Sequence, residues 1–229
     1  GLGDVYKRQL QYCDRVHPDI LIGTDPDCDR CGTAVPDGKG GYRLISGNEM
    51  GVILLDFICR SRIANGTMPE NPVAVTTIVS TDMVTAVAKK YGVELRRVLT
   101  GFKYIGEQIK WMEQAGKGHY VFGLEESYGC LAGTHARDKD AVVAVMCLCE
   151  VAAYCKKHNM TLWDMMVSMY EKYGYFKETQ YTITMKGIDG ARQIAEIMEK
   201  LRKNPPKAFG DLKVEKFRDY QNDVIIDME

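Results

Sequence analysis

Hydrophobic and polar residues follow two patterns along this chain. Short apolar runs, several of them rich in β-branched residues, predict strands at 19–23, 73–79, 93–99 and 119–122. Apolar residues spaced three or four positions apart predict helices at 48–63, 81–91, 104–115, 140–158 and 161–173. Because strands and helices alternate from residue 73 onward, the pattern predicts an α/β fold, with mostly parallel sheets and helices on both faces.

Several helix ends carry their own signals. Thr81 is the expected N-cap of the helix at 81–91, and Gly92 is expected to stop that helix. Thr161 and Asp164 have the spacing of a capping box, which would begin the last helix of the α/β region.

The pattern changes beyond Gly174. Residues 180–185 alternate like a half-exposed strand, 190–201 are amphipathic, and Asn204-Pro205-Pro206 would end that helix. We therefore expect a linker and the beginning of a further α+β domain at 175–229. The glycine-rich stretch 37–41 is a candidate boundary, which gives two earlier segments at 1–42 and 43–174. Residues 1–9 show no clear periodicity and begin with glycine, so we expect a truncation or a joining scar there.

Composition narrows the classes of protein. The chain has 229 residues, of which 45% are hydrophobic and 27% charged, as in ordinary globular proteins. Thirty Lys and Arg residues balance 31 Asp and Glu residues, so no global field favours nucleic acid or an anionic membrane. Cys147 and Cys149 lie in an apolar, helix-like run, and the eight cysteines are expected to be free thiols in a reducing, cytoplasmic compartment.

The segment 23–32 has the sharpest chemical pattern. Asp25, Asp27 and Asp29 alternate directly after a predicted strand, and such crowded negative charge is costly unless a cation neutralises it. An EF-hand is excluded because Arg30 and Pro36 stand where its loop requires Gly and Glu. Three carboxylates favour Mg²⁺ with a position left open for a phosphate oxygen, which Arg30 is placed to bind as well. The alternative is a solvated acidic turn.

Cysteines in the same segment suggest a second kind of site. Cys28 and Cys31 form a CxxC pair, which is used in zinc and redox sites. There is no second CxxC and no suitably spaced His pair in the sequence, so incidental small side chains in a tight loop are the favoured interpretation.

Three more segments place polar groups at expected loop positions. Residues 123–129 set Glu125 and Ser127 between glycines after the strand at 119–122, which suits a polyol ligand or, alternatively, a capped turn. Residues 100–103 begin a helix and give a weak anion-site signal. Residues 137–140 precede a helix, where mixed charge forms either a solvated cap or a contact for a phosphorylated ligand.

These segments, in this order, resemble the α-D-phosphohexomutase superfamily, with the greatest likeness to its bacterial phosphoglucomutase/phosphomannomutase-like members. The resemblance runs from about residue 10 to the end of the chain. It implies a four-domain enzyme, of which this chain would hold the end of the second domain, the third, and the start of the fourth. In the family, a phosphoserine on the first domain gives its phosphoryl group to a hexose phosphate. The bisphosphorylated sugar reorients and returns its other phosphate to the serine.

The resemblance also implies a role for each matching residue. Asp25, Asp27 and Asp29 would bind Mg²⁺, Arg30 would contact the phosphoryl group, and Lys139 would contact ligand and be a candidate for proton transfer. Glu125 and Ser127 would hold sugar hydroxyls. The remaining contacts to sugar or phosphate would come from Thr100, Gly101, Lys103 and Arg137. Glucose 1,6-bisphosphate would serve as activator or intermediate, and the implied reaction interconverts glucose 1-phosphate and glucose 6-phosphate.

Two family motifs have no counterpart in this sequence. There is no Ser-His-Asn-Pro segment of the kind that carries the nucleophile, and no Arg-x-Ser-Gly-Thr loop for the non-reacting phosphate. The expectation is therefore a phosphohexomutase fragment that holds half of the site and is inactive alone. Phosphomannomutase or phosphopentomutase activity and a non-catalytic sugar-phosphate-binding module remain alternatives. The expected partner is a sugar phosphate, with no nucleic acid and no membrane. The sequence does not predict an oligomeric state.

Overall fold

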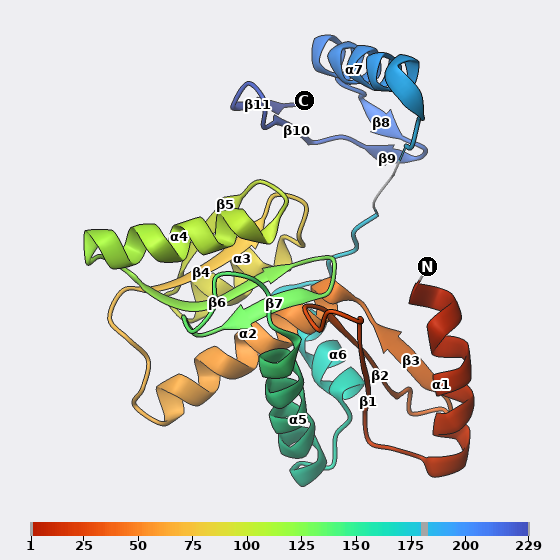
Figure 1. Cartoon of the computed structure of the whole chain (residues 1–229), viewed down its shortest axis with the longest axis vertical. Helices are drawn as coiled ribbons and strands as arrows, with labels where there is room; N and C mark the ends of the chain where they lie inside the picture. The colour runs from red at the N-terminus through yellow and green to blue at the C-terminus, as the bar shows by residue number, and fades with distance from the viewer. Residues whose placement is uncertain (1, 180–182, 229) are drawn as a thin grey trace. The chain divides into compact units, whose positions relative to one another are not determined.

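The protein is described here by a computed structural model that covers residues 2–179 and 183–228 (Figure 1). Contacts divide it into two compact units, one ending at Glu178 and the other beginning at Thr179. The helices of the described residues include none that is long and apolar enough to cross a bilayer. The predicted division of the chain at residues 42 and 174 stays a prediction.

The elements of the first unit follow the chain in a fixed order. They are α1 (Leu2–Val16), β1 (Leu21–Thr24), β2 (Cys31–Pro36), β3 (Tyr42–Ile45), α2 (Gly47–Ala64), β4 (Pro72–Thr77), α3 (Met83–Lys90), β5 (Glu94–Val98), α4 (Phe102–Ala115), β6 (His119–Glu125), β7 (Gly129–Ala132), α5 (Ala141–Lys157) and α6 (Leu162–Tyr173).

A four-stranded sheet in the order β5-β4-β6-β7 forms the centre of this unit. β4 pairs in parallel with β5 and β6, whereas β7 is an antiparallel edge strand. Alternate side chains of β4 enter different cores: Val73 and Val75 pack with α4 residues such as Ile105, while Ala74 joins the larger core of α2, α3, α5 and α6. The sheet is therefore covered on both faces, and the predicted α/β class is confirmed.

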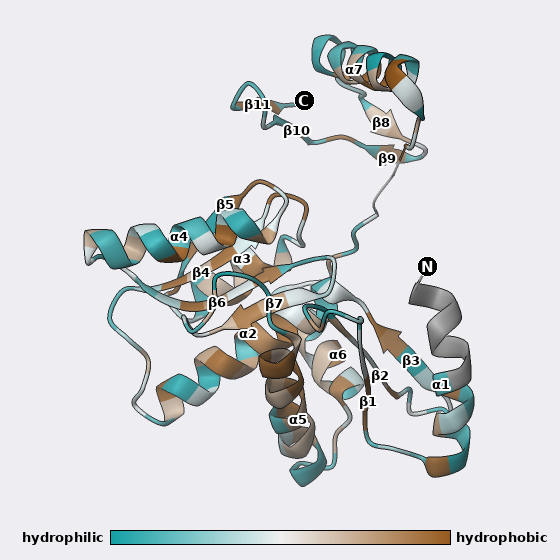
Figure 2. Ribbon diagram, viewed as in Figure 1, coloured by the Kyte–Doolittle hydropathy of each residue, from teal (hydrophilic) through white to brown (hydrophobic). Residues whose placement is uncertain are grey.

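The hydropathy of the helices matches these positions. In Figure 2, α5 is hydrophobic over much of its length, whereas α4 carries hydrophilic residues on one side. Buried α5 residues include Leu148 and Val151. Helices of this kind gain most of their stability from packing an apolar face rather than from intrinsic propensity.

An antiparallel sheet of β1, β2 and β3 precedes the parallel one, and the sequence analysis did not predict β2 or β3. The stretch 37–41 forms the turn between them, with the Asp37 carboxylate accepting the amides of Lys39 and Gly41 at 2.7 and 2.9 Å. In the β1–β2 hairpin, Thr24 pairs with Cys31. This pairing makes residues 25–30 the loop of a hairpin.

The observed starts of the helices agree in part with those predicted from the sequence. The capping box of Thr161 and Asp164 is present, and a second box joins Ser46 and Glu49 at the start of α2. The Thr81 hydroxyl does accept the Met83 amide at 3.1 Å, but α3 begins at Met83, so the expected N-cap is off by one residue. Residues 2–9, whose sequence has no clear periodicity, belong to α1, which runs from Leu2 to Val16.

The second unit combines one helix with two strand pairs. α7 (Gly187–Lys203) covers the helix predicted at 190–201, and Asn204 is its C-cap. β8 (Ala208–Phe209) pairs with β9 (Leu212–Lys213), and β10 (Lys216–Asp219) pairs with β11 (Val224–Asp227). Of the strand predicted at 180–185, residues 180–182 lie outside the described residues and 183–185 are not in a strand. The helix and short strands fit the expected α+β character.

Candidate functional site

The three aspartates predicted as metal ligands come together in the β1–β2 hairpin loop. One oxygen atom from each of Asp25, Asp27 and Asp29 lies within 4.8 Å of the other two. The backbone amides of Asp29 and Arg30 donate to Asp25 Oδ1 at 3.1 and 3.0 Å, so the loop curls around that side chain. Cys28 takes a left-handed conformation (φ +57°), which closes the turn between the second and third carboxylates.

Hydrogen bonding leaves part of this carboxylate cluster unsatisfied. Asp29 Oδ1 is buried and has no hydrogen-bond partner among the residues that the structure describes, and the Arg30 Nε atom lies 4.0 Å from it. Burial acts to raise the pKa of Asp25, but the hydrogen bonds from Arg30 and Asp29 outweigh it and lower that pKa overall. An anionic, oxygen-only donor set with an unpaired buried oxygen fits a hard divalent cation such as Mg²⁺.

Lys139 brings a cation to the same cluster from the loop before α5. Its Nζ atom lies 2.8 Å from Asp29 Oδ2 and 3.3 Å from Asp138 Oδ1, and its side chain is only 11% exposed. Burial acts to lower the pKa of Lys139, but the hydrogen bond to Asp29 and the charges of Asp138, Asp29 and Glu125 raise it overall. Lys139 is therefore a cation at neutral pH.

The predicted sugar loop lies directly beside Lys139. Glu125, at the end of β6, is 4% exposed and accepts a hydrogen bond from the Ser127 hydroxyl at 2.7 Å. A Cβ atom on Gly129 would lie 2.5 Å from Lys139 Cδ and 3.0 Å from Glu125 Oε1. Glycine at this position is thus what allows the Glu125 and Lys139 side chains to approach each other.

Backbone hydrogen bonds join the three loops into one surface. The Cys31 amide donates to the Tyr128 carbonyl at 3.2 Å, and the Ala141 amide donates to the Cys28 carbonyl at 3.1 Å. An isolated β-bridge also pairs Arg30 with Gly129. Because these contacts involve main-chain atoms, the acidic loop has a fixed position against the sugar loop and the start of α5.

The segment 100–103 approaches this surface at the start of α4. The Phe102 ring centroid lies 6.0 Å from Lys139 Nζ, which places the first turn of α4 near the cluster. Gly101, the N-cap, has φ +121° and makes no side-chain capping bond. Lys103 is exposed with its Nζ atom 4.9 Å from the Tyr104 ring centroid, and Thr100 is exposed as well.

The Arg137 side chain lies away from the carboxylate cluster. Its guanidinium donates to both oxygens of Glu113 at 2.8 and 2.6 Å and to the Thr134 carbonyl at 2.7 Å. Glu113 lies near the far end of α4, more than two turns from the first turn that approaches Lys139. The structure therefore does not bring the Arg137 side chain to the carboxylate cluster, and its predicted contact with ligand stays a prediction.

Two residues that the sequence analysis left without a role contribute to this site. Asp138 Oδ1 accepts the Lys139 backbone amide at 2.8 Å as well as its ammonium, and so orients that side chain. Tyr128 holds a left-handed conformation (φ +71°) and offers its carbonyl to the acidic loop. The adjacency of Asp138 to Lys139 was a usable signal, but nothing local marked Tyr128.

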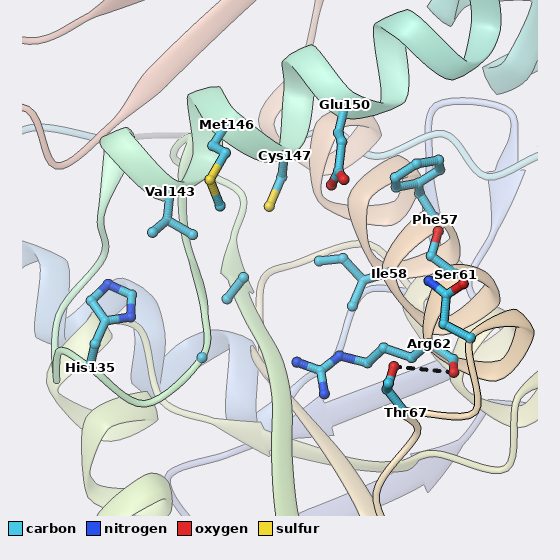
Figure 3. A pocket seen from close by; sticks show the side chains of 13 residues that line it. Phe57, Ile58, Ser61, Arg62, Thr67, His135, Val143, Met146, Cys147 and Glu150 are labelled. Carbon is cyan, nitrogen blue, oxygen red and sulfur yellow. Dashed lines mark hydrogen bonds between the residues drawn. The ribbon is translucent and has the colours of Figure 1, made fainter.

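A separate pocket of about 420 Å³ lies between α2 and α5 (Figure 3). Phe57, Ile58 and Met146 contribute apolar lining, and Arg62 and Glu150 contribute charge. It contains none of the residues predicted for the site. The carboxylate cluster instead lies in the β1–β2 hairpin loop of the first unit.

Known proteins resemble this chain in sequence over most of its length. A family model for phosphoglucomutase/phosphomannomutase, alpha/beta/alpha domain III, matches residues 46–173. A phosphoglucomutase from Staphylococcus aureus is 34% identical over 215 residues, which cover 94% of this chain and 38% of that protein. The chain thus spans about two fifths of the length of this curated relative.

Solved structures share the fold at low sequence identity. The phosphoglucomutase parafusin from Paramecium matches with a TM-score of 0.62 and 18% identity, over 96% of this chain and 38% of that one. N-acetylphosphoglucosamine mutase from Aspergillus fumigatus, solved with GlcNAc-6P and magnesium, matches with a TM-score of 0.50 and 13% identity, over 94% and 48%.

Proposed function

This chain belongs to the phosphoglucomutase/phosphomannomutase family, and on that premise we propose that it supplies the metal- and sugar-binding part of a phosphohexomutase. The proposed reaction interconverts glucose 1-phosphate and glucose 6-phosphate through a phosphoserine on another domain. The observation that carries the proposal is the junction of Asp29, Lys139 and Glu125. It joins a carboxylate oxygen without a hydrogen bond, a cation and a buried sugar-loop carboxylate on one surface.

Each side chain has a chemical task in this proposal. Asp25, Asp27 and Asp29 hold Mg²⁺, which when bound supplies positive charge beside the transferring phosphoryl group. The Arg30 side chain is 46% exposed and offers a forked pair of donors to phosphate oxygens. Lys139 keeps a proton beside Asp29 and is a candidate donor to a sugar oxygen.

Sugar recognition is assigned to the neighbouring loop. The Glu125 carboxylate accepts hydrogen bonds from sugar hydroxyls, and the Ser127 hydroxyl, now bonded to Glu125, turns toward the ligand. Residues 100–103 bind phosphate or sugar at the start of α4. Glucose 1,6-bisphosphate is the proposed intermediate, because the first transfer adds the serine's phosphoryl group to a sugar that already carries a phosphate, and the second transfer returns the other phosphoryl group to the serine.

The chain covers 38% of the length of its relative, which suggests that other domains supply the rest of the active site. We assign 1–42 to the end of a second domain, 43–174 to a third, and 175–229 to a linker and the start of a fourth. The serine nucleophile and the loop for the second phosphate then belong to other parts of the enzyme. Positioning and a phosphoryl carrier supply most of the rate enhancement, so this chain alone should bind ligands without converting them.

Calorimetry on the 229-residue chain tests the metal site. Mg²⁺ should bind the wild type, and Asp27→Asn should weaken binding by about tenfold or more, because one of three charged ligands is lost. Asp211→Asn, at an exposed position of the second unit, makes the same chemical change away from the site and is the matched control. Equal Mg²⁺ affinity in the wild type and Asp27→Asn would show that the triad is not the metal site.

A second experiment tests whether this chain binds glucose 1-phosphate without converting it. Pure chain incubated with glucose 1-phosphate, Mg²⁺ and glucose 1,6-bisphosphate should form no glucose 6-phosphate. Glucose 1-phosphate should nevertheless bind, and Glu125→Ala should weaken that binding by roughly ten- to a hundredfold, the typical effect of losing a charged hydrogen-bond acceptor. Measurable turnover by the chain alone would contradict the proposal. If mannose or ribose phosphates bind more strongly than glucose 1-phosphate, the proposed substrate changes to those sugar phosphates.

A further inference from the structure

Two adjacent glutamates in the sugar loop have different surroundings. Glu125 contacts Ser127 and lies beside Lys139 across Gly129. Glu126 is bound by the end of β4: its Oε2 atom accepts hydrogen bonds from Thr77 Oγ1 at 3.0 Å and Ser80 Oγ at 3.5 Å. These two hydroxyls are buried and their oxygen atoms lie 2.8 Å apart, so either both donate to Glu126 or one of them donates to the other, which then donates to Glu126. The Glu126 carboxylate is therefore engaged by the protein itself.

The turn that binds Glu126 is itself held in place from β5. The Arg97 guanidinium donates to Asp82 at 2.7 Å, to Thr85 at 3.1 Å, and to the carbonyls of Thr77, Ser80 and Thr81 at 3.3–3.5 Å. On the other side, Asn48 Oδ1 accepts the Thr81 amide at 3.1 Å. With so many donors on one turn, Thr77 and Ser80 form a rigid base for the Glu126 carboxylate.

The loop backbone is also pressed against the first turn of α2. A Cβ atom on Gly47 would overlap the Glu126 carbonyl and lie 2.8 Å from the Tyr128 amide nitrogen. The loop thus contacts α2 through its backbone and β4 through the Glu126 side chain. Of these two attachments, only the second depends on a titratable side chain of the loop.

We propose that Glu126 is a positioning residue, which fixes residues 125–129 so that Glu125 and Ser127 face the acidic loop, and that Arg97 acts on it through the turn 77–82. The inference rests on the proposed function only in assigning sugar contact to Glu125 and Ser127. A charged acceptor bound to two buried hydroxyls restricts the loop more strongly than a neutral one, because hydrogen bonds to charged groups are the stronger kind.

Hydrogen–deuterium exchange on the 229-residue chain tests the positioning role without any ligand. Glu126→Gln and Arg97→Lys should each speed exchange of amides 125–129 by about tenfold and leave amides 73–76 in β4 unchanged. Glu107→Gln, exposed on α4, and Arg96→Lys, the neighbour of Arg97 that binds Glu94 and Gln108, are the matched controls. Unchanged loop exchange in Glu126→Gln and Arg97→Lys would overturn the proposal. Should one of these variants fail to fold, the other decides.

Ligand binding gives a second readout that a general loss of structure would not produce. Glu126→Gln should weaken glucose 1-phosphate binding about tenfold and Mg²⁺ affinity much less, because Glu125 and Ser127 lie in the loosened segment, whereas the acidic loop contacts that segment through backbone atoms only. Equal weakening of both ligands would refute a role specific to the sugar loop. If the wild-type chain binds no glucose 1-phosphate, the proposed function fails at this step, whereas the exchange result still decides the role of Glu126.

Discussion

Replacing Lys139 by Met separates two roles that its ammonium has in the carboxylate cluster. In the metal-free chain, Lys139 is the cation closest to Asp29, with Nζ 2.8 Å from Oδ2. With Mg²⁺ present, the same ammonium competes for carboxylate charge. We therefore expect Lys139→Met to destabilise the metal-free chain and to strengthen Mg²⁺ binding.

The size of both effects follows from the geometry. At an effective dielectric constant of 20, charges 2.8 Å apart attract by about 6 kcal/mol, most of which desolvation offsets. A hydrogen bond to a charged group contributes about 1.5–3 kcal/mol net, so the metal-free variant should lose about 2 kcal/mol of unfolding free energy. Removing the ammonium also removes a repulsion toward a divalent cation held by the same carboxylate, and a repulsion of about 1.4 kcal/mol corresponds to an affinity that rises about tenfold.

Urea unfolding at zero and saturating Mg²⁺, together with calorimetric titration, measures the two effects separately. Saturating Mg²⁺ should stabilise Lys139→Met more than the wild type, because tighter binding to the folded state adds more stability. Lys110→Met, on the exposed face of α4, controls for the loss of a lysine. If Lys139→Met binds Mg²⁺ as weakly as the wild type or more weakly, the ammonium does not compete with the metal and the reasoning is wrong.

Two further predictions concern a buried cluster outside the site. The Asp56 side chain is 5% exposed and accepts hydrogen bonds from Tyr91, Lys172 and Tyr173, so Asp56→Ala should cost about 3 kcal/mol in urea unfolding. Burial, followed by the charge of Asp56, raises the pKa of Tyr91 to about 12. The folded state then favours neutral tyrosine, so stability is complete below about pH 10 and falls between about pH 10 and 12. Tyr91→Phe should remove part of that fall in melts at several pH values, and an unchanged slope would contradict it.

The acidic loop could be predicted from the sequence because its pattern of residues has a local chemical cause. Alternating carboxylates after a strand require a cation or a turn that separates them, and both readings predict residues 25–29 at a strand end. The structure adds what spacing alone could not provide, which is the contact of Lys139 with Asp29 across 110 positions of the chain. Only the resemblance to a family suggested that these two segments share one site.

Short strands were missed because their hydrophobic signal is weak. β2 reads Cys-Gly-Thr-Ala-Val-Pro, with a glycine and a proline in six residues, yet its first five residues are buried. β7 has four residues and begins at Gly129 within the sugar motif. Both strands pair antiparallel with a neighbour that forms a clearer pattern, so their existence depends on pairing rather than on their own composition.

Two charged residues also show that contacts between distant segments cannot be predicted from the local sequence. The position of Arg137 before a helix predicted either a solvated cap or a contact with a phosphorylated ligand, and it did not predict the ion pair that its guanidinium forms with Glu113 on α4. Asp56 lies in a predicted helix where a charge is usually exposed, and its burial follows from Tyr91 and Tyr173 on other elements. In both cases the partner is distant in sequence, and periodicity contains no information about it.

The main-chain bonds between the loops have a consequence for ligand binding. The Cys28 carbonyl within the acidic loop accepts a hydrogen bond from Ala141, and the Cys31 amide directly after the loop donates one to Tyr128, so ordering the acidic loop also restrains the sugar loop and the start of α5. A cation held by the aspartates would reduce the conformational freedom that a sugar phosphate must otherwise remove on binding. By thermodynamic linkage, each ligand should then bind more tightly in the presence of the other, through loops that belong to one compact unit.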